Sequence, residues 1–105
     1  MSFVDERERG FEAKFAHDEA QEFRAIARRN QKLGVWAAER MGLENGEEYA
    51  AAIVKTHVDQ SGAEGVLRKL TQDFTGAGLT IPTYEIAGKM DEFLAVSREE
   101  LKTGL

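Results

Sequence analysis

The sequence contains no cysteine, which excludes disulfide bonds, thiol catalysis and metal sites built from thiolates. Signals for β-strands are also scarce, because β-branched residues are scattered and do not alternate with polar ones. No apolar run approaches the ~20 residues that a membrane-spanning helix needs. The first residues hold no apolar segment long enough for a signal peptide. We therefore expect one soluble, cytoplasmic domain, although a peripheral partner of a membrane complex would look the same.

Charge of one sign is not concentrated anywhere in the chain, whose net charge is −5. A nucleic-acid-binding domain normally carries a basic stripe, and none dominates this sequence. An amphipathic helix that lies on a membrane would need lysine-rich flanks, which are also missing. The sequence therefore predicts neither nucleic-acid binding nor direct membrane insertion.

Motifs that carry chemistry are missing as well. The two histidines, His17 and His57, fall in different predicted helices without the spacing of a zinc site. The glycine-containing runs 61–65 and 76–78 lack the Gly-Lys-Ser/Thr sequence that binds phosphate and magnesium. No serine has a base nearby in the sequence, and His57 is best interpreted as a boundary residue of the core. We expect neither an enzyme nor a metal site.

Apolar residues recur at helical spacing in four segments of the chain. They predict helices at about 18–41, 46–60, 63–75 and 83–103. Gly42 and the run 76–78 end helices, and Pro82 suits the entrance of the last one. Asn45 with Glu48, and Ser61 with Glu64, match the capping pattern at a helix start. The sequence thus predicts an all-α fold, a small antiparallel four-helix bundle (19–105) with a flexible, partly helical N-terminal arm (1–18).

The boundary between arm and bundle follows from two carboxylates. Glu19 and Glu22 interrupt the apolar stripe of the first helix, and unpaired carboxylates are rarely buried. The buried stripe should therefore begin near Phe23. The preceding arm carries three phenylalanines, each worth about 1.5–3 kcal/mol if covered, so we expect it to fold when it binds a partner. The alternative is that these aromatic side chains fold back on the bundle.

The polar face of the first helix carries four cations, Arg24, Arg28, Arg29 and Lys32. Such a face is usually solvated. The alternative is a site for an anion or a nucleotide, formed by Arg28, Arg29, Lys32 and Trp36. Trp36 lies at the edge of the apolar stripe, so a half-buried position in the core is favoured over stacking on a ligand.

A family resemblance enters at the arm. The run from Asp5, DERERGFEAKFAHDEAQEFRAIARRNQKLGVWAAERMG, resembles the opening of the zeta subunit family, the ATPase inhibitor subunits of alphaproteobacterial F-type ATP synthases. FEAKFAHD, ARRN and LGxWAA are its specific parts. The resemblance continues through 66–74 and 86–90 and covers essentially the whole chain. The entrance of the last helix, Pro82-Thr83-Tyr84, departs from the more acidic sequence expected of the family.

The resemblance implies a regulatory subunit, monomeric when free, that lies in the cytoplasm beside the inner-membrane synthase. Its N-terminal segment would insert at a catalytic interface between the α and β subunits, near the central rotor subunit, and block ATP hydrolysis. The implied partner-binding residues are Phe3, Asp5, Glu6, Arg7, Glu8, Arg9, Phe11, Lys14 and Phe15. No cofactor is implied beyond weak ATP or ADP binding. The alternative is a helical adaptor that senses adenine nucleotide or another anion on its bundle.

Overall fold

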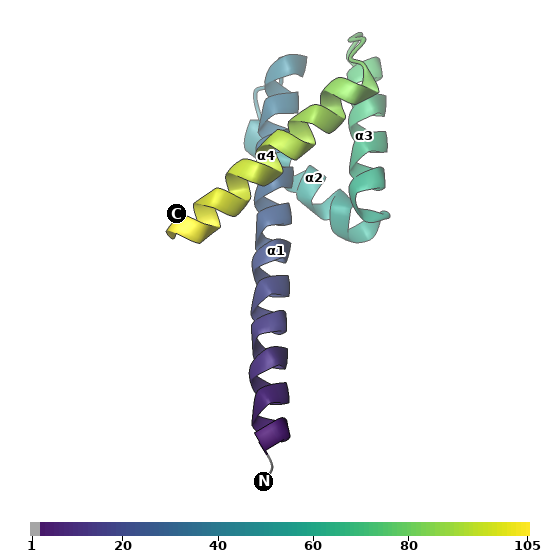
Figure 1. Cartoon of the computed structure of the whole chain (residues 1–105). Coiled ribbons are helices and arrows are strands. Elements are labelled where there is room, and N and C mark those ends of the chain that lie inside the picture. Colours follow the sequence, from purple (N-terminus) through teal and green to yellow (C-terminus); the bar gives the residue numbers. More distant parts are fainter. Residues whose placement is uncertain (1–2) are drawn as a thin grey trace.

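The computed structural model describes the backbone of residues 3–105 and the side chains of residues 17–105. This part of the chain forms four α-helices and no strand: α1 (Phe3–Met41), α2 (Gly46–Asp59), α3 (Gly62–Gly76) and α4 (Thr83–Thr103). The all-α, four-helix prediction is confirmed. In Figure 1, α4 crosses α1 diagonally, and α1 runs well past the ends of the other three helices. The backbone of the predicted arm continues α1 from Phe3 without a break, whereas the side chains of residues 1–16 lie outside the described part of the chain.

The core is made by one face of each helix. Its members are buried apolar side chains, Leu33, Ala37, Ile53, Val66, Leu70, Phe74, Ile86 and Met90. Most of them belong to the predicted stripes, which is why the helical periodicity of the sequence was sufficient to find them. Trp36 lies half-buried at the edge of this core, as expected, with its ring 5.6 Å from that of Phe74 in an edge-to-face arrangement.

The prediction that the buried stripe begins near Phe23 is right about the position in the chain and wrong about Phe23 itself. Phe23 is 64% exposed, and the first buried apolar residue of α1 among those described is Ala25. The reason is the length of α2, which runs beside α1 and ends at Asp59. His57, in the last turn of α2, lies opposite Arg29. The neighbouring helix therefore ends before it can cover Phe23.

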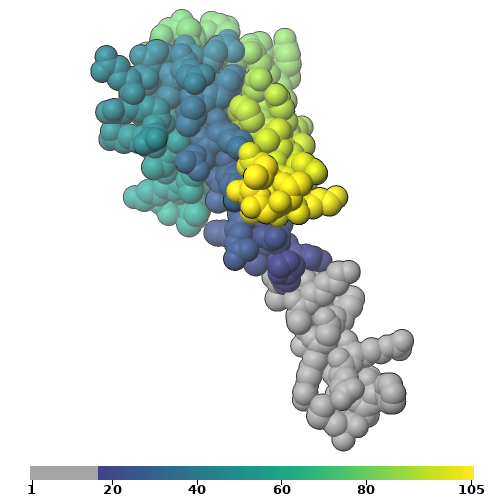
Figure 2. All heavy atoms as spheres, turned by 90° about the vertical axis from the view of Figure 1, so that its left-hand side faces the viewer, coloured from purple at the N-terminus to yellow at the C-terminus, as the bar shows by residue number. Residues whose placement is uncertain are grey.

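Glu22, which the sequence analysis treated as an unpaired interruption of the apolar stripe, pairs with another helix. Its carboxylate accepts hydrogen bonds from the guanidinium of Arg98 on α4, with Nε 3.1 Å from Oε2. Figure 2 shows the last turns of α4, in yellow, lying against α1 at this level. Glu22 is therefore not an unpaired carboxylate, and its partner lies 76 positions away in the chain. Glu19 is exposed, as a carboxylate without a buried role should be.

The predicted helix ends are confirmed where glycine makes them. Gly42 (φ +72°) and Gly78 (φ +77°) adopt the left-handed conformation that follows a helix. The next residue in each case closes the turn, with the Leu43 N–H donating to the Ala38 carbonyl at 2.9 Å and Leu79 bonding to Phe74 likewise. These two glycines fix where α1 and α3 end.

The predicted capping boxes are not formed. Asn45 has φ −97° and ψ 65°, which is not the extended conformation of a capping residue, and its amide donates to the Glu48 carboxylate at 3.2 Å. Ser61 is left-handed, with φ 53°, because only two residues connect α2 to α3. Neither side chain bonds a backbone N–H of its helix. The residue types of a capping box are therefore present at both helix starts, but the backbone conformation of Asn45 and Ser61 does not place their side chains on the helix N–H groups.

Gly34 lets α1 and α2 approach closely, and alanine there is expected to destabilise the protein by about 1–3 kcal/mol through overpacking. A Cβ at this position would lie 2.4 Å from the Ala50 Cα, so the two backbones would have to separate. Gly88 of α4 is the control, because a Cβ there meets nothing within 4 Å. Gly88→Ala should stabilise the protein by up to about 1 kcal/mol. Urea unfolding measures both; equal effects would contradict the close approach.

Candidate functional site

A groove between α1 and α4 collects three of the four residues predicted to bind an anion. Arg28, Lys32 and Trp36 line it from α1, and Phe93 and Glu100 line it from α4. Its volume is about 580 Å³. The residues meet here because they are spaced four apart on α1 and so share one face of the helix.

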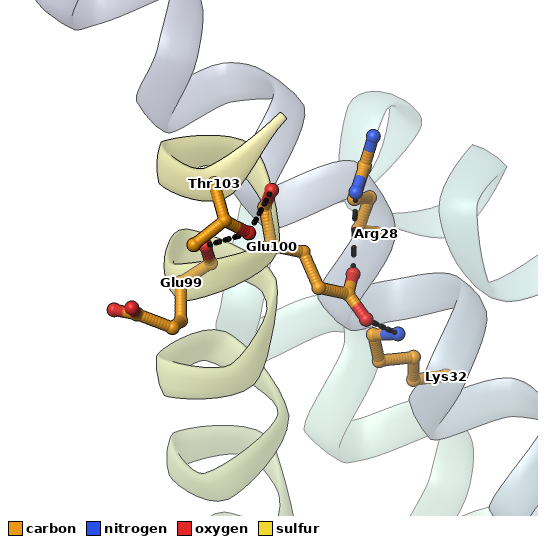
Figure 3. Close-up of polar contacts among 5 residues, drawn as sticks. All are labelled: Arg28, Lys32, Glu99, Glu100 and Thr103. Atoms are coloured by element: carbon orange, nitrogen blue, oxygen red, sulfur yellow. Dashed lines mark hydrogen bonds and ion pairs between the residues drawn. The ribbon is translucent and has the colours of Figure 1, made fainter. Parts of the chain in front are cut away.

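The two cations of this groove already hold a carboxylate of the same chain. Lys32 Nζ donates to Glu100 Oε2 at 2.8 Å, and Arg28 Nη1 donates to Glu100 Oε1 at 3.2 Å (Figure 3). The hydrogen bond from Lys32, followed by that from Arg28, lowers the pKa of the Glu100 carboxyl. Arg28 and Lys32 are therefore paired within the chain, although their side chains stay 35% and 31% exposed to solvent. An external anion would have to compete with Glu100 for them.

Arg29 does not join this groove, contrary to the predicted grouping. It is 6% exposed and faces α2, where Nη2 lies 3.4 Å from the His57 Nδ1. Its Nε donates to the Asn30 side-chain oxygen at 3.1 Å. Burial lowers the pKa of the Arg29 guanidinium, which nevertheless stays charged. The sequence placed four cations on one polar face, whereas α2 covers one of them.

His57 is a half-buried boundary residue, as the sequence analysis proposed. Burial, and secondarily the positive charge of Arg29, lower the pKa of its imidazole. Its Nδ1 accepts from Arg29, so the neutral ring carries its proton on Nε2. Protonating the ring would place two positive charges side by side between α1 and α2.

We expect the free energy of unfolding to fall as the pH drops below about 6.5, the ordinary pKa of histidine. The folded state keeps His57 neutral to a lower pH than the unfolded chain does, so the unfolded state binds more protons in this window and acid favours it. Urea unfolding at pH 7.5 and 5.5 measures the change, and His57→Gln should reduce it. The pKa values of Glu22 and Glu100 are lowered from 4.5, so these two carboxyl groups change the stability of the fold only in more acidic solution.

Ion pairs hold α4 along α1. Arg40 pairs with Glu85 near the start of α4, at 3.0 Å, and Glu22 pairs with Arg98 near its end. The hydrogen bond from Arg98 is the main cause of the lowered pKa of Glu22. No sequence motif signals these pairs, because their members lie far apart in the chain. Of the two, only the pair of Glu22 with Arg98 lies near the predicted arm.

The residues predicted to bind the partner lie outside the described side chains. This applies to the three arm phenylalanines and to the charged residues between 5 and 14, so their contacts stay a prediction. The described part of α1 begins with exposed side chains from His17 to Ala20. Within residues 17–105, no group of three or more histidine or acidic side chains is arranged to hold a metal ion. None of the described helices has the length and hydropathy of a membrane span.

One of the comparisons with known proteins identifies the family. A comparison with curated proteins found no match. A protein solved by solution NMR is 35% identical, with a TM-score of 0.68, and the similarity covers 80% of this chain and 98% of that one. The family model described as ATPase inhibitor subunit zeta matches residues 1–100. The chain therefore belongs to the zeta family of ATPase inhibitor subunits and is a regulatory protein of the ATP synthase, not an enzyme.

Proposed function

We propose that this subunit binds the catalytic head of an F-type ATP synthase and inhibits ATP hydrolysis by inserting its N-terminal segment between an α and a β subunit. Membership of an inhibitor family supports the activity. The main structural support for insertion of the N-terminal segment is the length of α1. It is one continuous helix from Phe3 to Met41, and its first half extends past the rest of the fold (Figure 1). A bundle needs no such extension to complete its own core.

The extension suits insertion into a crevice. A helix with Phe3, Phe11 and Phe15 offers apolar anchors of the kind that dominate helix-in-groove binding. The charged residues from Asp5 to Arg9 would pair with charges along the crevice and set orientation and association rate more than affinity. The ion pair of Glu22 with Arg98 links the base of the helix to α4. The bundle would then present the helix in one direction.

Inhibition follows if the crevice must close during hydrolysis. A helix held between the α and β subunits resists that closure. The central rotor subunit then cannot turn in the direction of hydrolysis. Rotation in the direction of synthesis opens the crevice and releases the helix. The protein would therefore oppose hydrolysis while synthesis proceeds.

Site-specific cross-linking tests this placement. A photoreactive amino acid at position 11 should cross-link to both α and β subunits of the purified synthase head. The same group at Tyr84, which is 80% exposed on the bundle, is the control and should give far less product. Cross-links from position 11 to other subunits alone would reject the proposed interface.

A second proposal concerns weak binding of ATP or ADP on the bundle, for which the groove beside Arg28 and Lys32 is the best-placed site. Because Glu100 holds both cations, Glu100→Gln should strengthen binding of an anionic nucleotide. Titration of ATP into isotopically labelled protein should shift amide signals around residues 28–36. Unchanged spectra for both proteins would rule this site out.

A further inference from the structure

The first turns of α1 after the arm carry an apolar side chain that the fold does not bury. Phe23 is 64% exposed. It lies in a shallow hollow lined only by α1 residues, which we name the Phe23 patch: Glu19, Ala20, Glu22, Phe23 and Ile26. No residue of α2, α3 or α4 contributes to this lining. Aromatic side chains are enriched where a partner covers a protein surface, and Phe23 lies on a helix face that leaves it available for such a contact.

The position of the patch indicates which partner that is. Phe23 lies about two helical turns beyond residue 16, on the same uninterrupted helix as the segment proposed to enter the synthase. α2 ends at Asp59, two residues after His57, which lies opposite Arg29, and no residue of α2 lines the patch. A synthase subunit that holds the first half of α1 is therefore the nearest surface that can reach Phe23.

The charges around the patch specify the chemistry of the contact. Asp18 and Glu19 are exposed at its N-terminal border. Glu22, at its side, is held by Arg98 and so does not need a cation from the partner. A matching surface would offer an apolar pocket for Phe23 with lysine or arginine along one border.

We propose that the Phe23 patch is a second docking surface for the synthase head, which receives Phe23 in an apolar pocket bordered by basic residues. This inference rests on the proposed function, since it assigns the patch to the same partner as the arm. The arm would supply the blocking segment, and the patch would hold the base of α1 at the mouth of the crevice. Its contact continues the arm interface along one helix.

The full-length variant Phe23→Ala tests the proposal. It should raise the concentration needed for half-inhibition of ATP hydrolysis by about 10- to 100-fold, the loss expected when a partner no longer buries a phenylalanine. Its urea midpoint should stay close to that of the unmodified protein, because the ring is mostly in water. Tyr84→Ala, an exposed aromatic side chain outside the patch, is the matched control and should inhibit normally. Normal inhibition by Phe23→Ala would overturn the proposal.

Charge and self-association supply independent readouts. Glu19→Lys should slow association with the synthase head and weaken its dependence on salt. Sedimentation of the free protein tests the other occupant: if Phe23→Ala abolishes a dimer and leaves inhibition unchanged, the patch binds a second copy and the proposal is wrong.

The arm is tested separately. Loss of inhibition on arm deletion, with normal inhibition by Phe23→Ala, would reject this inference alone, whereas undiminished inhibition without the arm would reject the proposed function.

Discussion

A chain that lacks residues 1–18 is expected to lose inhibition of ATP hydrolysis, with its half-inhibitory concentration raised at least about 100-fold. The deletion removes three phenylalanines whose burial in a partner would supply about 1.5–3 kcal/mol each, and about 1.4 kcal/mol corresponds to tenfold in affinity. It also removes the helix that would keep the crevice open. Steady-state hydrolysis by the synthase head, titrated with either protein, measures the difference.

The same deletion should leave the bundle folded. Among the α1 side chains that the structure describes, from residue 17 on, the buried ones begin at Ala25, and the ion pair of Glu22 with Arg98 lies beyond the deleted segment. Thermal unfolding followed by circular dichroism should therefore give a cooperative transition close to that of the full chain. If the folded, shortened protein still inhibits as strongly, the arm is not the inhibitory element and the bundle must carry the activity.

Phe74→Ala is expected to lower the free energy of unfolding by about 3–5 kcal/mol, the usual cost of removing a buried aromatic side chain. Phe74 is 1% exposed and lies in the core that all four helices share. Its loss would leave a cavity and remove the edge-to-face contact with Trp36. In a domain of this size such a loss is a large part of the total stability, so the variant should be partly unfolded under mild conditions.

Urea unfolding followed by circular dichroism measures this effect, because the fluorescence of Trp36 changes for local reasons as well. Tyr84→Ala is the control, with a side chain of similar size that is 80% exposed, and should change stability by no more than about 0.5 kcal/mol. An effect of Phe74→Ala below 1 kcal/mol, on the order of a surface change, would mean that the core closes around the gap or that Phe74 is less central than its burial indicates.

The sequence alone determined the class of fold and most of the core. Stripes such as Val66, Leu70 and Phe74 bury one face of a helix whatever its neighbours are, because an amphipathic helix has only one apolar side to hide. Gly42 and Gly78 ended helices as predicted, since a left-handed residue is a local requirement. These features depend on residues close together in the chain, and so local patterns reveal them.

The tertiary structure alone decided what each polar residue of α1 does. Glu22 pairs with Arg98, Arg28 and Lys32 share Glu100, and Arg29 lies buried against α2. No spacing along the helix distinguishes these cations from one another. Their surroundings depend on where α2 ends and how α4 crosses, which are properties of long-range packing. For the same reason Phe23, apolar and correctly spaced for the core, remains in water: the helix that would have covered it ends too soon.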